Sequence, residues 1–384
     1  MTKKTIVHVI DNLGRGGAET MLVSLLKDLN SVYNIVLVTL TDVSDFEDSK
    51  IICYKKYNLG FNHFYDLPSS VFKLRKIIRA HSPVIVRTQL FWSTIIGRIA
   101  TPFNIPIVFS VHSKLSQDAF QNSRIAYWLE KITYKKRHTM IAVSDTVLHD
   151  YDSYIGVKGK NYVIHNFVDP LFFKKDYDFS QQDPSVLKLV AVGNLRDAKN
   201  YEFLLHAIEL VKDNITISLD IIGEGVLRKP LQAIIEKKNL PVRLLGKKDN
   251  VHELLPQYNL YIMCSHYEGF GNGPVEAMAI GLPLILNDLD TMKEMSKDNA
   301  LFFETNTVHL LADLLCSLQH KQNILSGLSE NGKTIALEYY TKEKYFNRLK
   351  EVYNECIVKP LLLNLPRQGS NPLNNISIIL KQFN

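Results

Sequence analysis

The chain has 384 residues, of which 46% are hydrophobic and 22% charged, a balance that is ordinary for a soluble globular protein and sufficient for two domains. No apolar stretch approaches the ~20 residues needed to span a bilayer, and an apolar strand pattern follows Met1 too closely for a signal peptide. The four cysteines have neither metal-ligand nor redox spacing. We therefore expect a cytoplasmic protein with reduced thiols and exclude a membrane-spanning one.

The net charge of +6 is concentrated in the first half of the chain. Residues 1–185 carry 23 Lys and Arg against 17 Asp and Glu, whereas the remainder carries 22 of each. A basic face of this kind attracts an acidic membrane surface or a phosphate-bearing acceptor. Nucleic acid is a third class of anion, but no nucleic-acid-binding motif accompanies these charges, so we expect none.

The first element is an apolar run at residues 5–10, which predicts a buried strand that leads through a glycine-rich loop into an amphipathic helix. This order is typical of a Rossmann-type unit. As a dinucleotide fingerprint the loop is incomplete, because Glu19 stands where the third glycine of G-x-G-x-x-G belongs. Gly16 and Gly17 remain candidates for close approach to a ligand, and a tight turn without a ligand is the alternative.

Further strand patterns at residues 34–40, 84–87 and 105–111 alternate with helical patterns, which predicts a parallel sheet covered on both faces. His112 follows the last of these strands. Because α/β proteins bind ligands at the carboxyl ends of their parallel strands, His112 is a candidate site residue. A hydrogen-bonded structural histidine is the alternative.

Residues 69–80 predict an amphipathic helix with apolar side chains on one side and Lys and Arg on the other. Two interpretations stay open. We favour a crossover helix that packs on the sheet and leaves its basic face in solvent; the other is a membrane-surface helix. The basic run at residues 131–138 adds to the same bias.

A polar stretch at residues 171–186 lacks helical or strand periodicity and predicts a linker. A second strand and loop then restart at residue 187 and carry Arg196 and Lys199 close to a predicted helix start. Cations at that place favour a diphosphate, because the helix dipole adds to their charge. Solvated surface charges are the alternative for both. Residues 218–228 and 242–250 supply two further strand-and-turn units.

The most distinctive stretch is residues 265–283, which follows an apolar strand pattern. Its loop holds three glycines, Gly269, Gly271 and Gly273, and Pro274 suits the first turn of the helix that follows. Free backbone N–H groups at such a helix start form an anion site. Glu268 and Glu276 flank this loop, where carboxylates can accept hydrogen bonds from hydroxyls of the same ligand.

The spacing E-x7-E of Glu268 and Glu276, within E-G-F-G-x-x-P-V-E-A-M-A-x-G-L-P, closely resembles the signature of family-4 glycosyltransferases, retaining enzymes of the GT-B fold. This resemblance implies an α/β fold with two Rossmann-like domains facing across a cleft. It divides the chain into an acceptor-binding domain (residues 1–170), the linker (171–186) and a nucleotide-sugar-binding domain (187–335). A helix that crosses back to the first domain (336–358) and a tail of open role (359–384) follow.

The resemblance also implies a reaction and its residues. A sugar would move from a nucleotide-diphosphate sugar, expected to be UDP-linked, to an acceptor hydroxyl with retention, without metal or cofactor. His112 and Glu268 carry the catalytic roles by resemblance. The implied donor-binding residues are Gly16, Gly17, Arg196, Lys199, Leu245, Gly246, Lys247, Phe270, Gly271, Asn272 and Glu276. A hinge near Asp169 would let the two domains close.

By the same resemblance, the acceptor belongs to bacterial surface-polysaccharide or lipid-linked glycan synthesis, which would place the protein at the inner face of the membrane. Two residues depart from the family pattern, Asn194 in place of an arginine and Phe167 in place of a glycine. A non-catalytic sugar-nucleotide-binding subunit therefore stays open, and an NAD-dependent oxidoreductase is a weaker alternative. We interpret the D-x-D pair Asp288 and Asp290 as a strand end rather than a metal motif.

Overall fold

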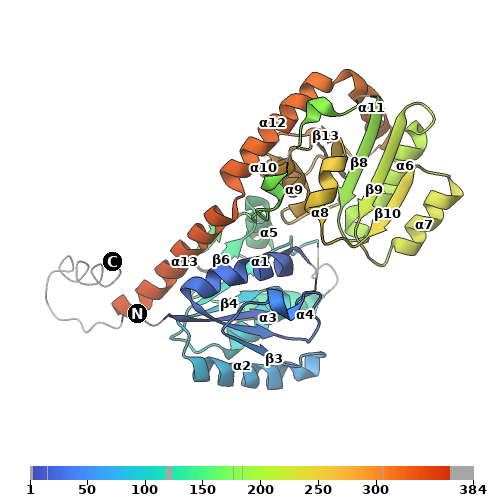
Figure 1. The fold of residues 1–384 in the computed structure, drawn as a ribbon. Helices are drawn as coiled ribbons and strands as arrows, with labels where there is room; N and C mark the ends of the chain where they lie inside the picture. Colours follow the sequence, from blue (N-terminus) through green and yellow to red (C-terminus); the bar gives the residue numbers. More distant parts are fainter. Residues whose placement is uncertain are drawn as a thin grey trace.

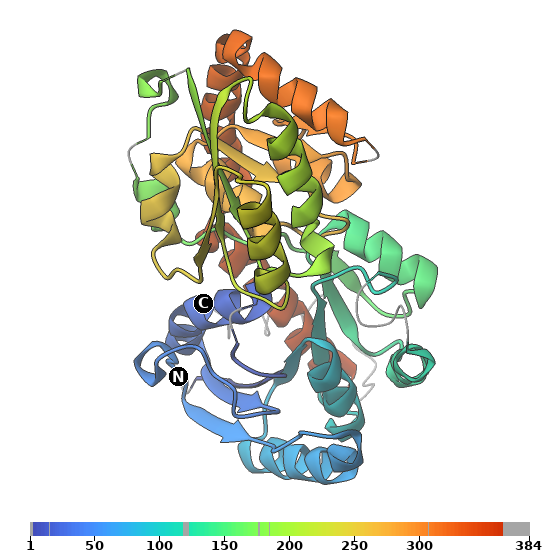
Figure 2. The ribbon, with the colours of Figure 1, turned by 90° about the vertical axis from the view of Figure 1, so that its right-hand side faces the viewer.

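The computed structural model describes residues 3–14, 16–117, 123–175, 177–183, 185–305 and 307–363. Within them the chain forms two parallel β-sheets, one of seven and one of six strands, each with helices packed on it (Figure 1). The expected α/β class with two Rossmann-like domains is thereby confirmed. Figure 2 shows the two domains one above the other, with the first strands and helices of the chain in the lower one.

The first sheet has the strand order β3-β2-β1-β4-β5-β6-β7, and every neighbouring pair is parallel. Its central strands are almost wholly buried, as their Val- and Ile-rich runs predict. The strands are β1 (Thr5–Ile10), β2 (Asn34–Thr39), β3 (Lys55–Asn58), β4 (Ile85–Gln89), β5 (Ile107–Val111), β6 (Thr139–Ala142) and β7 (Asn161–Val163). The strand order reverses between β1 and β4, where α/β sheets open a ligand crevice.

The helices of this domain are α1 (Gly17–Val32), α2 (Leu67–His81), α3 (Phe91–Ala100), α4 (Arg124–Thr133) and α5 (Asp145–Tyr154). The favoured interpretation of the helix predicted at residues 69–80 is confirmed, because Leu74 and Ile78 of α2 are fully buried. Its basic face also serves the fold. Lys73 donates to the backbone oxygen of Leu59 at 2.7 Å, and Arg75 donates to the carbonyls that end α3.

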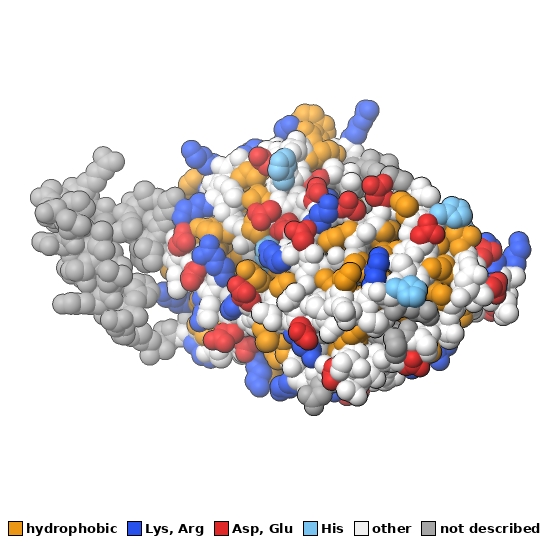
Figure 3. Space-filling view, turned by 90° about the horizontal axis from the view of Figure 1, so that it is seen from above, with side chains coloured by type: hydrophobic (Ala, Val, Ile, Leu, Met, Phe, Trp, Pro, Cys, Tyr) orange, Lys and Arg blue, Asp and Glu red, His pale blue; other side chains and the backbone are white. Residues whose placement is uncertain are grey.

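The second sheet has the order β10-β9-β8-β11-β12-β13. Its strands are β8 (Val186–Val192), β9 (Thr216–Ile222), β10 (Val242–Gly246), β11 (Leu260–Met263), β12 (Leu284–Asn287) and β13 (Leu301–Phe303). Its helices are α6 (Tyr201–Val211), α7 (Arg228–Lys237), α8 (Val251–Leu254), α9 (Asn272–Ile280), α10 (Asp290–Ser296) and α11 (Val308–Ser317). Asp288 follows β12 and pairs with Lys293, whereas Asp290 begins α10. The face seen from above in Figure 3 mixes acidic and basic side chains, as the balanced charge of this half predicts.

The helix that returns to the first domain differs from the prediction of one helix over residues 336–358. The structure has α12 (Gln322–Tyr339) and α13 (Lys342–Leu363), which follow one another along one side of the molecule (Figure 1). The break occurs because the backbone leaves helical hydrogen bonding to pair with another segment: Val168 donates to the oxygen of Tyr340 at 2.8 Å, beside a Val168–Thr341 bridge. No described helix is long and apolar enough to cross a bilayer.

Beyond the break, α13 packs on the first domain, where Leu349 and Tyr353 are buried against α1 and the sheet. The second domain is therefore connected to the first at two places, by the segment after β7 and by this helix. Most of the tail predicted at residues 359–384 lies outside the described residues, which end at Leu363.

Candidate active site

The loop between β11 and α9 presents Glu268 in a fixed position. The Glu268 carboxylate accepts a hydrogen bond from Ser265 Oγ at 2.7 Å and forms an ion pair with Lys199 Nζ at 2.5 Å. Its backbone oxygen accepts from Thr291 Oγ1 at 3.2 Å. Gly271 then takes a positive φ of 89° at the start of α9, a conformation that glycine adopts without strain. The structure thus brings the predicted residues Glu268, Lys199 and Gly271 together.

The first domain meets this loop directly. A Cβ atom at Gly269 would lie 2.0 Å from the backbone oxygen of His112, so only glycine fits there. Ser144 of the first domain donates from Oγ to the Gly269 oxygen at 2.7 Å. The strand end that carries His112 and the loop that carries Glu268 are consequently in van der Waals contact, with the cleft closed at this point.

The glycine loop after β1 approaches α9 from the same side. A Cβ atom at Gly17 would lie 2.8 Å from Nδ2 of Asn272, the first residue of α9. The Asn272 side-chain oxygen also accepts a hydrogen bond from Asn166 of the first domain at 2.9 Å. At Gly16, the neighbour of an added Cβ would be the Glu19 side chain of its own helix. Gly17 is therefore the glycine that faces the second domain.

His112 is held by a chain of polar side chains inside the first sheet. Gln89 lies with its amide nitrogen 3.2 Å from His112 Nε2 and its amide oxygen 2.7 Å from His8 Nε2. In this orientation Gln89 donates to His112, so the imidazole proton sits on Nδ1. Burial, and then the charge of Arg87, lower the pKa of His112 to about 3. His112 is consequently neutral at physiological pH and can act as a hydrogen-bond donor.

Glu276 lies in the first turns of α9, partly buried. Burial raises its pKa from 4.5 to about 8, and the nearby carboxylate of Asp169 adds to the shift. Asp169 in turn accepts hydrogen bonds from the Leu171 backbone N–H at 3.0 Å and from Ser24 Oγ at 3.3 Å. The segment expected to act as a hinge thus also contributes to the raised pKa of Glu276.

The remaining predicted donor residues are more spread out. Arg196 is exposed at the start of a short 3-10 turn that ends at Lys199. Gly246 has a positive φ of 73°, next to half-buried Leu245, and Lys247 pairs with Asp45 of the first domain at 2.7 Å. The Phe270 ring is buried against His165 and Tyr340, so that only its backbone is available to a donor.

Sequence reasoning missed the most highly hydrogen-bonded contact between the domains. Glu294 of α10 accepts from the backbone N–H groups of Asp145 and Thr146 at the start of α5, at 2.7 and 3.1 Å, and from His165 Nε2 at 2.8 Å. Burial alone would raise the pKa of Glu294. The hydrogen bonds that it accepts, of which the one from His165 has the largest effect, lower the pKa to about 2. Only the carboxylate, together with the capping serine and aspartate at Ser144–Asp145, could have suggested this contact.

Asp145, His165 and Glu294 also form a group of three potential metal ligands within the described part of the chain. Both Glu294 oxygens already accept hydrogen bonds from the first domain, and Asp145 is exposed. The arrangement is accounted for as a domain contact without an ion.

The two departures from the family pattern have different surroundings. Phe167 is 7% exposed and its ring centroid lies 5.1 Å from that of Tyr345 on α13. Its bulk therefore fills the joint between the first domain and the returning helix. Asn194 is exposed beside the loop of Arg196, and no contact in the described residues accounts for its replacing an arginine.

Two family models match adjacent halves of the chain. Residues 15–171 match the model described as Glycosyltransferase Family 4, and residues 174–335 match the model described as Glycosyl transferases group 1. Together with the two-sheet fold and the Glu268–Glu276 loop, these matches define the protein as a glycosyltransferase of the GT-B fold. The chain belongs to the family-4 glycosyltransferases.

Named relatives fall in the same class. The chain is 22% identical over 266 residues to an N-acetyl-alpha-D-glucosaminyl L-malate synthase of Bacillus anthracis, covering 66% of this chain and 68% of that protein. It is 25% identical over 294 residues to an N-acetylgalactosamine-N,N'-diacetylbacillosaminyl-diphospho-undecaprenol 4-alpha-N-acetylgalactosaminyltransferase of Campylobacter jejuni, with coverage of 73% and 79%. The Anabaena protein HepE, whose structure contains UDP and glucose, superposes with a TM-score of 0.77 at 19% identity, covering 91% and 99% of the two chains.

Proposed function

We propose that this glycosyltransferase moves a sugar from a UDP-sugar to a hydroxyl of a lipid-linked or surface-polysaccharide glycan, with retention at the anomeric carbon and without a metal ion or other cofactor. The observation that carries the proposal is the position of Glu268, pinned by Lys199 on the donor side and packed through Gly269 against His112 of the other domain. Both halves of a two-domain transfer site thus meet around one carboxylate.

The donor side offers a group for each part of a nucleotide-diphosphate sugar. The amides at Gly271 and Asn272 begin α9 and suit the diphosphate, with Lys199 and Arg196 as cations. Glu276 suits the ribose hydroxyls. Its pKa is raised in the ligand-free protein, and hydrogen bonds donated by those hydroxyls would stabilise the charged carboxylate. The backbone of residues 245–247 suits the base, and Gly17, which meets Asn272 at the start of α9, suits close approach to the donor from the opposite domain, with Gly16 beside it.

The barrier in such a transfer comes from charge separation, as the sugar becomes oxocarbenium-like and the diphosphate leaves as an anion. Fixed donors at that anion lower the barrier, because they need no reorganisation during the reaction. Lys199 and the N-terminus of α9 supply this stabilisation in the proposal, which is why no metal is required. Glu268 then holds the hydroxyls of the sugar, and neutral His112 orients sugar and acceptor. The leaving phosphate removes the acceptor proton in a front-face reaction, so no protein base is assigned.

The relatives support the donor and the acceptor. HepE was solved with UDP-glucose as well as with UDP. The Campylobacter relative acts on a diphospho-undecaprenol-linked sugar, and a second relative from Escherichia coli is a UDP-galactose-dependent transferase for a similar lipid-linked acceptor. A lipid-linked acceptor in turn requires a place at the inner face of the membrane, for which the basic first domain is suited.

The test replaces Glu268 by Ala and uses Glu209→Ala as the matched control, because Glu209 also pairs with a lysine at 2.5 Å but lies on the surface of α6. We expect the first variant to lose roughly 100-fold or more in turnover with an unchanged melting temperature, and the control to keep full activity. NMR of the product in the presence of EDTA should show the anomeric configuration of the donor. Full activity of Glu268→Ala, an inverted product or abolition by EDTA would each overturn the corresponding part of the proposal.

A further inference from the structure

The outer face of α4 exposes three large apolar side chains. Ile125, Trp128 and Ile132 are 64%, 56% and 60% exposed. Their spacing of three and then four residues places them along one side of a helix, so they form a continuous apolar stripe in solvent. A helix on the surface of a soluble domain ordinarily turns such a stripe toward the core.

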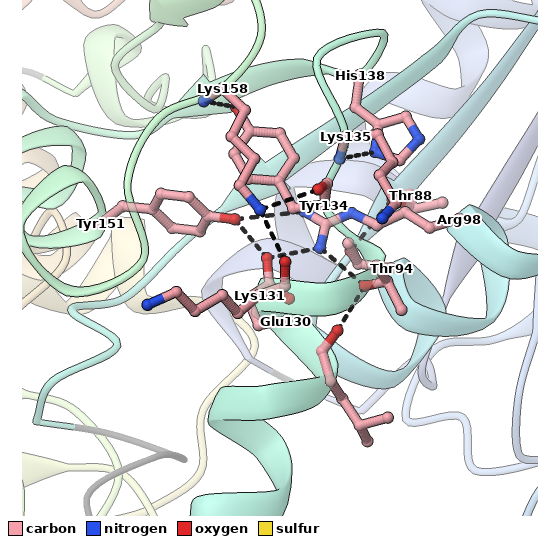
Figure 4. Close-up of polar contacts among 12 residues, drawn as sticks. Thr88, Thr94, Arg98, Glu130, Lys131, Tyr134, Lys135, His138, Tyr151 and Lys158 are labelled. Carbon is pink, nitrogen blue, oxygen red and sulfur yellow. Dashed lines mark hydrogen bonds and ion pairs between the residues drawn. The ribbon is translucent and has the colours of Figure 1, made fainter.

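The inner face of the same helix carries its acid. Glu130 is 3% exposed and accepts from Arg98 Nη1 of α3 at 2.7 Å and from Tyr151 Oη of α5 at 2.5 Å (Figure 4). The Arg98 guanidinium also stacks over the rings of Phe109 and Tyr134, at 4.1 and 5.0 Å from their centroids. This buried ion pair fixes the rotation of α4. Turning the helix over to hide the stripe would strand Arg98 without its partner.

Cations surround the stripe. Residues 123–138 contain five Lys and Arg but a single acid, Glu130, which is neutralised inside the domain. Arg124, at the start of α4, and Lys135 and Lys136, just after it, are exposed, as is Lys158, which donates from Nζ to the oxygens of Lys131 and Tyr134. A tryptophan and two isoleucines bordered by basic groups have the composition of a helix that lies in the interface of an anionic bilayer.

We propose that the stripe Ile125, Trp128 and Ile132 of α4 inserts into the surface of a membrane rich in anionic lipid, and that the cations around it hold the first domain there. This inference rests on the proposed function for its purpose, since α4 belongs to the same domain as His112 and docking would bring that domain to a lipid-linked acceptor. It also relocates the membrane contact. The basic helix α2 uses part of its charge within the fold and exposes one large apolar side chain, Phe72, whereas α4 exposes three along one side together with cations.

The experiment measures sedimentation of the full chain with phosphatidylcholine vesicles that contain or lack phosphatidylglycerol. The variants are Trp128→Ser, the triple variant Ile125→Ser, Trp128→Ser, Ile132→Ser, and the control Phe72→Ser, which removes an aromatic ring that is 71% exposed on α2. We expect the wild type and the control to bind phosphatidylglycerol vesicles, with binding weakened by salt. Trp128→Ser should bind about tenfold more weakly, and the triple variant should bind less still. Trp128 fluorescence should shift to the blue when vesicles are added.

Equal binding by the wild type and the triple variant would overturn the proposal, as would equal loss in Phe72→Ser or no binding of the wild type at low salt. A dimer that forms without vesicles and disappears in the triple variant would instead assign the stripe to a second copy of the chain. UDP-induced stabilisation, measured on the same proteins, tests the donor site separately. Its absence from wild type and variants alike would refute the proposed function while leaving the vesicle result intact.

Discussion

Replacing Glu276 by Gln should stabilise the ligand-free protein at alkaline pH. The folded carboxyl keeps its proton up to about pH 8, whereas in the unfolded chain it is released near 4.5. The folded state therefore loses stability relative to the unfolded state as pH rises between these values. Glutamine resembles the protonated carboxyl at every pH and does not incur this loss.

The size of the effect follows from the shift. A change from 4.5 to about 8 corresponds to roughly 4–5 kcal/mol at full burial, and the partial exposure of Glu276 reduces this to on the order of 3 kcal/mol. For domains of this size such a difference raises the melting temperature by several degrees. We expect the melting temperatures of wild type and Glu276→Gln to coincide below about pH 5 and to diverge up to about pH 9.

The assay is thermal unfolding of both proteins across this pH range without nucleotide. Asp169→Asn is the matched control, because it removes the second cause of the shift and keeps an oxygen for the hydrogen bond from Ser24. The difference between its melting temperature and that of its own Glu276→Gln double variant should stop growing at a lower pH than for the wild type, because the folded-state pKa of Glu276 is lowered. A Glu276→Gln protein that melts below the wild type at about pH 9 would refute the burial argument.

Four further substitutions test other parts of the site. Glu294→Gln should loosen the domain contact, which small-angle scattering would show as a larger radius of gyration and kinetics as a higher donor KM; an unchanged radius would contradict that role. Phe167→Ala should cost about 3 kcal/mol of stability, seen in denaturant unfolding, and leave UDP-induced stabilisation intact. Gln89→Glu should raise the pKa of His112 from about 3, observable by NMR of labelled histidine, because a carboxylate there favours the imidazolium. Lys199→Met should lower kcat more than it raises KM; the opposite pattern would assign this lysine to ground-state binding.

The fold was largely predictable, because parallel sheets bury whole Val- and Ile-rich strands and leave clear apolar runs between glycine loops. The loop between β11 and α9 was predictable for a similar reason: Gly269 and Gly271 are required by close backbone approach and positive φ, which the sequence records directly. The helix predicted at residues 336–358 returns to the first domain but is interrupted, because α12 ends at Tyr339 and α13 begins at Lys342. Its break at Thr341 depends on pairing with Val168, and a contact so distant in sequence leaves no local pattern.

The interdomain residues were the least predictable part of the site. Glu294 was an ordinary helix carboxylate until the fold placed it against the start of α5, and Gln89 gained its place beside His112 only from strand order. The exposure of the α4 stripe could not be predicted, because its local pattern indicates burial. Its apolar spacing predicts a buried face, and only the buried partner of Arg98, Glu130, shows that the helix is turned the other way.

Thermal unfolding with UDP, GDP, ADP or NAD, all in EDTA, tests directly whether the second domain binds a nucleoside diphosphate. We expect UDP selectively to raise the melting temperature of the wild type, and Glu276→Ala to abolish most of this rise. A larger rise with NAD, or an equal rise with UDP in Glu276→Ala, would contradict this expectation.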